Sequence, residues 1–403
     1  MLAQNYAPPK TDGKMPNYFA PGVFMEEIGV RNRVITGVPT SVAALVGLAS
    51  KGPFAANRKP KLISSFAEFQ TIYGGTKDLA QISPKTNYLA YAVRNFFDEG
   101  GKQIYIARVK SKLKRDWENA MRVVASWNVS IIAAPGSTEF GSVANAIQKM
   151  LVAQAEAPNA YRIAVLELPK GKTPAEASVY AGQFKSDFVA FYYPWITVAN
   201  PNFKAGDPVS PKNLTLPPSG FLCGLYAKND HERGVFKSPA NLPVISALGF
   251  ERNVSSADQD LLNLSGVNSL RTVAGRGNLV WGAGTSSANP EWKYVSVRRY
   301  FTYLQQSIQQ GTRWVCFEPD DAKLWALARN AISDFLLLEW RNGALPGTKP
   351  EEAFFVRCDR TTMTQDDINR GRLICEIGVA AVKPAEFVIF RIGQWTADAK
   401  DKA

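Results

Sequence analysis

The chain has 403 residues, 46% of them hydrophobic and 20% charged, and its formal net charge is +12. This is the composition of a globular protein with room for two or three domains. The polar, proline-rich start has no apolar segment of the kind that directs secretion, and no run of about 18 apolar residues could span a membrane. We therefore expect neither standard secretion nor membrane insertion.

The first elements that the pattern predicts lie in residues 88–109. Apolar residues recur every three or four positions from Tyr88 to Phe96, which is typical of a helix with one buried face. Gly100 and Gly101 end this helix, and the apolar run that follows them predicts a buried strand.

Strands and helices alternate between residues 127 and 198. The expected strands are 127–136, 161–169 and 188–198, and the expected helices are 142–157 and 174–186. Such alternation predicts βαβ units with right-handed crossovers around a largely parallel sheet. The fold class is therefore α/β.

Two breaks rich in proline, glycine or serine divide the rest of the chain. Residues 200–220 predict a long connection, and residues 282–292 precede a separate C-terminal part. The expected parts are an extended N-terminal arm at residues 1–22, an outer α/β domain at 23–288, a smaller C-terminal α+β domain at 289–394 and a polar tail at 395–403.

The C-terminal part contains a strongly amphipathic helix. Asp320 and Asp321 can cap its start, and Asn342 with Gly343 supplies a left-handed stop. Its expected buried face consists of Leu324, Leu327, Ala328, Ala331, Ile332, Phe335, Leu338 and Glu339, and its expected exposed face of Lys323, Arg329, Asn330, Ser333 and Asp334. After it we expect a strand at 353–358, a short helix at 364–371, and a closing β-hairpin of residues 373–382 and 386–392.

Few residues favour a chemical role. Cys223, Cys316, Cys358 and Cys375 are far apart in sequence and lack metal-ligand spacing, so we expect buried thiols in a reducing compartment. His231 is the single histidine, and a surface loop explains it better than catalysis.

Other candidate sites are equally weak. Residues 133–142 and 274–287 lack the patterns of nucleotide-binding loops, although parallel sheets often bind ligands. Helix capping explains the acidic cluster at 318–321 better than a metal site does. We therefore expect no catalytic residue, no metal and no cofactor.

Most of the excess positive charge lies in the first third of the chain, including residues 108–115. A basic run after a strand favours a solvated loop, and the interleaved aromatic residues of a single-strand nucleic-acid surface are missing. The alternative is a basic surface that meets an acidic surface of a partner subunit.

The order of motifs along the chain resembles that of contractile tail sheath proteins, which occur in contractile phage tails, pyocin-like particles and extracellular injection systems. The motifs are NYFAPGVFMEEI, SVAALVGLASKGP, SFAEFQTIYGG, YYPW, WKYVSVRRY, FEP, GAL-x-G, EEAF-x-V-x-C and KPAEFVIFRI, in that order. The resemblance covers roughly residues 17–395. Single motifs are weak but their succession is specific. Gly284-Thr285 and the FEPDD sequence depart from the family pattern and put local contacts in doubt.

The resemblance implies a structural subunit that polymerises as stacked hexameric rings around an inner tube and contracts to drive the tube through a target envelope. It implies that terminal segments join the sheets of neighbouring subunits by strand addition. The residues that we assign to this exchange are Phe24, Met25, Glu26, Phe387, Ile389 and Arg391, and the candidate tube contacts are Lys323 and Arg329.

The implied partners are further copies of the chain, the tube protein, and baseplate and tail-terminator or cap proteins, with no specific nucleic acid and no membrane insertion. Assembly is expected in the bacterial cytoplasm. Three alternatives stay open: terminal segments that pair within their own chain, a non-contractile tail or capsid protein, and an α/β ligand-binding enzyme.

Overall fold

The computed structural model describes residues 34–55, 60–79, 86–206 and 211–386, which belong to one compact unit. The expected N-terminal arm, the NYFAPGVFMEEI motif, the polar tail and all but the first residue of the second hairpin limb lie outside these ranges. Within the described ranges, no helix combines the length and the apolar character needed to cross a bilayer.

A nine-stranded sheet in the order β2-β3-β1-β4-β5-β6-β11-β12-β9 forms the centre of the larger part. Neighbouring strands from β3 to β11 pair in parallel, whereas β2, β12 and β9 join antiparallel at the two edges. The strands are β1 Ala43–Gly47, β2 Leu62–Ile63, β3 Ile104–Arg108, β4 Ile131–Ala133, β5 Ile163–Glu167, β6 Val189–Tyr193, β9 Leu242–Pro243, β11 Val267–Val273 and β12 Gly277–Val280. The predicted α/β fold with a largely parallel sheet is confirmed.

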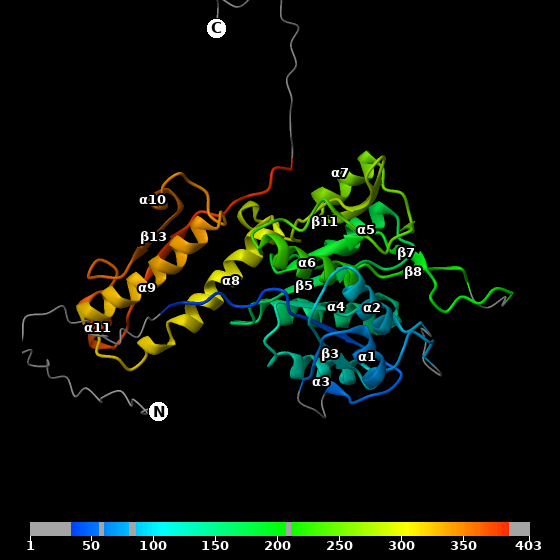
Figure 1. Cartoon of the computed structure of the whole chain (residues 1–403), viewed down its shortest axis with the longest axis horizontal. Coiled ribbons are helices and arrows are strands. Elements are labelled where there is room, and N and C mark those ends of the chain that lie inside the picture. Colours follow the sequence, from blue (N-terminus) through cyan, green and yellow to red (C-terminus); the bar gives the residue numbers. More distant parts are fainter. Residues whose placement is uncertain (1–33, 56–59, 80–85, 207–210, 387–403) are drawn as a thin grey trace, which may run out of the picture. The chain divides into compact units, whose positions relative to one another are not determined.

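Helices cover both faces of this sheet, because side chains of a buried strand alternate between its faces. Leu45 belongs to the core on one face, and Ala44 and Val46 belong to the core on the other. The first core is completed by α1 Phe66–Tyr73, α2 Tyr88–Asp98 and α6 Ser219–Arg233, and the second by α3 Lys114–Val124, α4 Ala144–Glu156, α5 Pro174–Ala181 and α7 Ser256–Leu264 (Figure 1).

Helices α2 and α6 cross so closely that two positions of α6 require glycine. A Cβ atom on Gly220 would lie 2.6 Å from Cα of Ala92, and one on Gly224 would lie 2.5 Å from the carbonyl oxygen of Phe96. Both contacts are with backbone atoms, which cannot move aside as the end of a flexible side chain can. The two glycines therefore set the distance between these helices.

The expected strand at residues 188–198 is split in two. Pro194 lacks the N–H group that would continue the ladder, so β6 ends at Tyr193 and β7 Ile196–Ala199 begins a second sheet. That sheet has the order β10-β7-β8, with β8 Asn213–Leu216 and β10 Gly249–Phe250. The prediction of one long connection at residues 200–220 was wrong, because alternating polar and apolar residues in β8 pair antiparallel with β7.

The C-terminal part is built from two long helices and a two-stranded sheet. Its elements are α8 Val295–Gly311, α9 Ala322–Arg341, α10 Pro350–Ala353, β13 Phe354–Arg357, α11 Gln365–Asn369 and β14 Glu376–Val379. Short 3-10 helices are η2 Ser137–Glu139, η3 Gly141–Val143, η4 Pro290–Trp292 and η5 Arg313–Val315. The Asp321 carboxylate accepts from the Leu324 N–H at 2.8 Å, and Gly343 has a φ of 76°, so both predicted ends of α9 are confirmed.

Two expectations for this part differ from the structure. β14 pairs antiparallel with β13, a pairing that the sequence analysis did not foresee, and the hairpin partner of β14 lies outside the described residues. Leu327 and Leu338 were expected on the buried face of α9, but their side chains are 47% and 53% exposed. The buried face of α9 is rotated relative to the expected one, because Trp325 and Leu336 are buried where Leu327 and Leu338 were expected.

Candidate functional site

Of the residues predicted to take part in assembly, only Lys323 and Arg329 lie in the described ranges. Phe24, Met25, Glu26, Phe387, Ile389 and Arg391 all lie outside the described residues. Lys323 is exposed in the first turn of α9, whereas Arg329 is only partly exposed, which corrects its expected place on the open face. At about 100° per residue the two side chains lie about 120° apart around the helix, so they do not form one patch.

The structure instead brings charged residues together where α8 meets the parallel sheet. Arg299 donates to both carboxylate oxygens of Asp230, at 2.9 and 2.6 Å, and to the carbonyl oxygen of Thr40 at 3.0 Å. The side chains of Arg299 and Asp230 are 4% and 1% exposed. This bidentate ion pair joins α8 to the end of α6 and to the segment before β1.

Arg298, the preceding residue, makes a second link. It donates to the Asp187 carboxylate at 2.9 Å, and its guanidinium carbon lies 4.1 Å from the ring centre of Trp292 and 4.4 Å from that of Phe188. Stacking between two aromatic faces adds cation–π attraction to the ion pair. Both arginines therefore pair with a carboxylate of the same chain, although the buried Nε of Arg298 has no hydrogen-bond partner.

Burial makes the first ion pair sensitive to the loss of either partner. Burial raises the pKa of Asp230, and the Arg299 guanidinium opposes that rise. A carboxylate with no water around it depends on its cationic partner to stay ionised.

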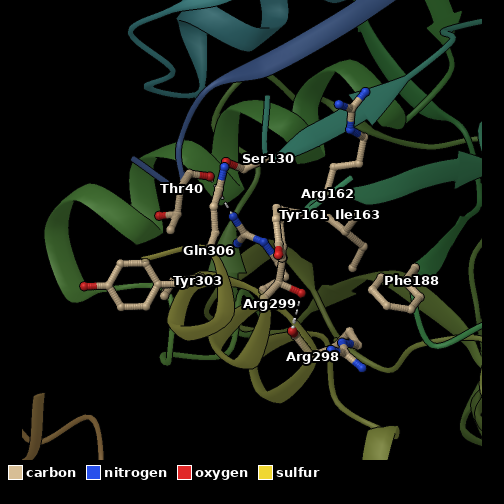
Figure 2. A pocket seen from close by; sticks show the side chains of 12 residues that line it. Thr40, Ser130, Tyr161, Arg162, Ile163, Phe188, Arg298, Arg299, Tyr303 and Gln306 are labelled. Atoms are coloured by element: carbon tan, nitrogen blue, oxygen red, sulfur yellow. Dashed lines mark hydrogen bonds between the residues drawn. The ribbon is translucent and has the colours of Figure 1, made fainter. Parts of the chain in front are cut away.

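The pocket at this junction is too small for a ligand. Figure 2 shows Arg299 and Gln306 of α8 beside Thr40 and Ser130. The pocket lined by these and neighbouring residues measures about 10 Å³. That volume holds about one water molecule. A second hollow of about 140 Å³ is lined mainly by apolar side chains around Phe54, Tyr73 and Trp127 and has Lys61 as its one charged lining residue. Neither presents a group of acids and bases to a substrate.

Helix α8 belongs to both parts of the described chain. Val295 at its start is buried in the core of the sheet, and Tyr300 and Leu304 are buried in the core of the C-terminal part. The hydroxyls of Tyr300 and Tyr303 donate to the buried carboxylate of Glu339 in α9, at 3.2 and 2.9 Å. The helix is thus a structural bridge between the two cores, and Figure 1 shows it beside α9.

Sequence reasoning missed the most perturbed carboxyl group, Glu167 at the carboxyl end of β5. It is 1% exposed and accepts a hydrogen bond from the Ser219 hydroxyl at 2.6 Å. Burial raises its pKa to about 8, against the opposing effect of Ser219 and the backbone N–H groups of Gly136 and Ser137. A glutamate inside an apolar strand was the signal available in the sequence. Neither described pocket reaches it, so it is placed to affect stability rather than to meet a substrate.

Within the described residues, the histidine and the four cysteines show no arrangement that indicates a catalytic or metal site. His231 lies exposed in the last turn of α6, not in a loop as expected. Cys223 and Cys358 are buried as expected, but Cys316 is exposed because it follows the end of η5, and Cys375 is partly exposed. In the part of the chain that the structure describes, no three or more histidine, cysteine or acidic residues gather as a metal site would require.

Two family models match consecutive stretches of the chain. The phage tail sheath protein central domain matches residues 113–286, and the phage tail sheath C-terminal domain matches residues 287–394. Together they cover more than half of the sequence. The chain belongs to the phage tail sheath family.

Individual sheath proteins are similar over most of this sheath chain. The tail sheath protein of Escherichia phage P2 is 26% identical over 333 residues, which are 75% of this chain and 78% of the phage protein. The anti-feeding prophage helical sheath in its contracted state is 28% identical, with a TM-score of 0.77 over 93% of this chain and 99% of that one. The contracted sheath of PVC, an extracellular contractile injection system, is 26% identical, with a TM-score of 0.76 over 96% of this chain and 100% of that one.

These likenesses confirm the predicted family and make the chain a structural sheath subunit. Its relatives are components of phage tails or of tail-like particles, and the subunit assembles into a sheath within such a particle.

Proposed function

We propose that this sheath subunit polymerises as stacked hexameric rings around an inner tube and contracts to drive the tube through a target envelope. The observation that carries the proposal is the likeness, over more than nine-tenths of the chain, to two sheaths described in their contracted state. No catalytic step is part of this function. An increase of about 300 Å² in buried apolar surface per subunit would supply roughly 7 kcal/mol, which adds up along the sheath.

Strand addition between subunits is the proposed link within the lattice. Among the described residues, β13 and β14 pair only with each other, which leaves one edge of each strand open. An isolated two-stranded sheet is marginally stable, so added strands would strengthen it. We assign the added strands to the segments around Phe24, Met25 and Glu26, and around Phe387, Ile389 and Arg391.

Removal of residues 1–28, which include Phe24, Met25 and Glu26, tests this link. The truncated chain should stay soluble and keep the melting temperature of the α/β part, but should form no sheath. Negative-stain electron microscopy of the truncated and full chains, alone and co-expressed with a tube protein, measures the outcome. Ridged cylinders of normal length from the truncated chain would contradict strand exchange by the arm, and single subunits from the full chain with tube protein would contradict the sheath function itself.

Tube contact is proposed for the start of α9, through Lys323. Its side chain is exposed in the first turn, and reversal of a charge at an interface changes association strongly. Lys323→Glu should lower the fraction of sheath that sediments with tube by about tenfold, whereas Lys149→Glu, an exposed lysine on α4, should not. If both variants sediment with the tube to the same extent, Lys323 does not contribute to the tube contact. Arg329 is the second candidate, partly exposed on another side of the helix.

The finer assignments follow the same proposal. We propose domain boundaries at residues 22, 288 and 394, and the meeting of the two family models at residues 286 and 287 supports the second of them. The proposed partners are tube, baseplate and tail-terminator or cap proteins, and assembly is proposed in the bacterial cytoplasm before the particle acts.

A further inference from the structure

Two cysteines that are distant in sequence lie opposite each other beside the two-stranded sheet. β13 and β14 pair antiparallel with Arg357 opposite Glu376. This register, continued by one residue, places Cys358 directly opposite Cys375. Opposed residues on antiparallel strands have Cβ atoms about 4.5–5.5 Å apart, close to the separation in a disulfide. The backbone thus already has nearly the geometry of a cross-strand disulfide.

The side chains of both cysteines turn into the same small core. Cys358 is 1% exposed and packs with Leu324, Trp325 and Met363, and Cys375 packs against this group. Both thiols are free, and the thiol of Cys375 donates a hydrogen bond to the sulfur of Cys358. The two sulfur atoms therefore face each other rather than diverge.

The surroundings prepare one thiol for reaction and leave the other accessible. The hydrogen bond from Cys375 lowers the pKa of the Cys358 thiol, and the nearby Arg329 guanidinium lowers it further. A lower pKa increases the fraction of thiolate, which is the form that attacks a disulfide. Cys375 is partly exposed, so a small molecule can reach it.

We propose that Cys358 and Cys375 form a reversible disulfide within the subunit when the protein meets a small-molecule disulfide such as oxidised glutathione. The accessible Cys375 sulfur passes its proton to the neighbouring Cys358 sulfur and attacks that molecule, which gives a mixed disulfide and one small thiolate; this thiolate takes the proton from Cys358 and leaves as a small thiol. The Cys358 thiolate then attacks the Cys375 sulfur and expels the second small thiol. Two protein thiols are oxidised, one external disulfide is reduced, and the two protons end on the released thiols.

This crosslink goes beyond the proposed function and does not depend on it. In a reducing compartment both cysteines stay as thiols, and in an oxidising medium the bond joins β14 to β13. The bond closes the loop that contains α11 and fixes the strand from which the C-terminal segment continues.

The test uses the full chain with Cys316→Ser, which removes the exposed cysteine. Treatment with oxidised glutathione, alkylation under denaturing conditions and peptide mapping by mass spectrometry should find Cys358 joined to Cys375. Alkylatable thiols should fall from three to one, dithiothreitol should restore them, and the melting temperature should rise by about 5 °C on oxidation.

The chain with Cys316 intact should give the same linked peptide, and Cys358→Ala should leave Cys375 bearing glutathione. Mapping of the unaltered chain decides the question even if the Cys358→Ala variant does not fold. The proposal is wrong if Cys375 of the unaltered chain carries only glutathione, if it pairs with Cys316, or if both thiols remain alkylatable after treatment.

Discussion

Replacement of Asp230 by alanine should lower the free energy of unfolding by about 3–5 kcal/mol, because it leaves the Arg299 guanidinium buried without its carboxylate. The expected cost is large since both side chains are almost fully removed from water and joined by two hydrogen bonds. Urea denaturation followed by tryptophan fluorescence measures it on the unpolymerised subunit.

An exposed ion pair provides the matched control. Lys293 and Glu386 lie 2.6 Å apart, with side chains 46% and 31% exposed, so Glu386→Gln should cost less than about 1 kcal/mol. The double variant Asp230→Ala/Arg299→Met should recover part of the stability, since no unpaired charge remains buried. Equal effects of Asp230→Ala and Glu386→Gln would show that the junction does not depend on this pair.

Glu167→Gln should remove a pH-dependent loss of stability. The folded protein holds the Glu167 proton with a pKa of about 8, raised from 4.5 by burial. Below pH 4.5 the carboxyl is protonated in both states, so the group adds no pH dependence there. Between pH 4.5 and 8 the unfolded chain releases the proton while the folded chain keeps it, so stability falls as pH rises.

The expected fall from this group is about 3–5 kcal/mol across that window. Unfolding free energies of the wild type and Glu167→Gln, measured by urea denaturation at several pH values, should therefore diverge as pH rises, with the variant more stable at the upper end. Ser219→Ala removes the hydrogen bond that opposes the shift and should extend the window upward. Parallel profiles of wild type and Glu167→Gln would contradict the buried, protonated state.

The local sequence pattern was sufficient to predict elements whose bounds depend mainly on their own residues. The periodicity of α4, the capping of α9 by Asp321 and the capping box that starts α11 at Thr364 all match the structure. The order of motifs also identified the family, because it reflects the whole chain rather than one site.

Features that depend on contacts across the chain were not predictable in this way. Asp230 and Arg299 are 69 residues apart, and nothing in the sequence around either indicates that they pair. The exposure of Leu327 and Leu338 depends on which side of α9 the rest of the C-terminal part covers. Cys358 and Cys375 meet only because β13 and β14 pair with each other, a partnership that the apolar runs alone left open.

The sharing of α8 between two cores determines how the subunit responds to force. A helix of 17 residues is about 25 Å long and stiff along its axis. Val295 at its start is buried in the sheet core, and Tyr300 and Tyr303 near its middle donate to Glu339 of α9, so no flexible linker separates the two contacts. We therefore expect the sheet and the C-terminal part to move together rather than to bend at α8.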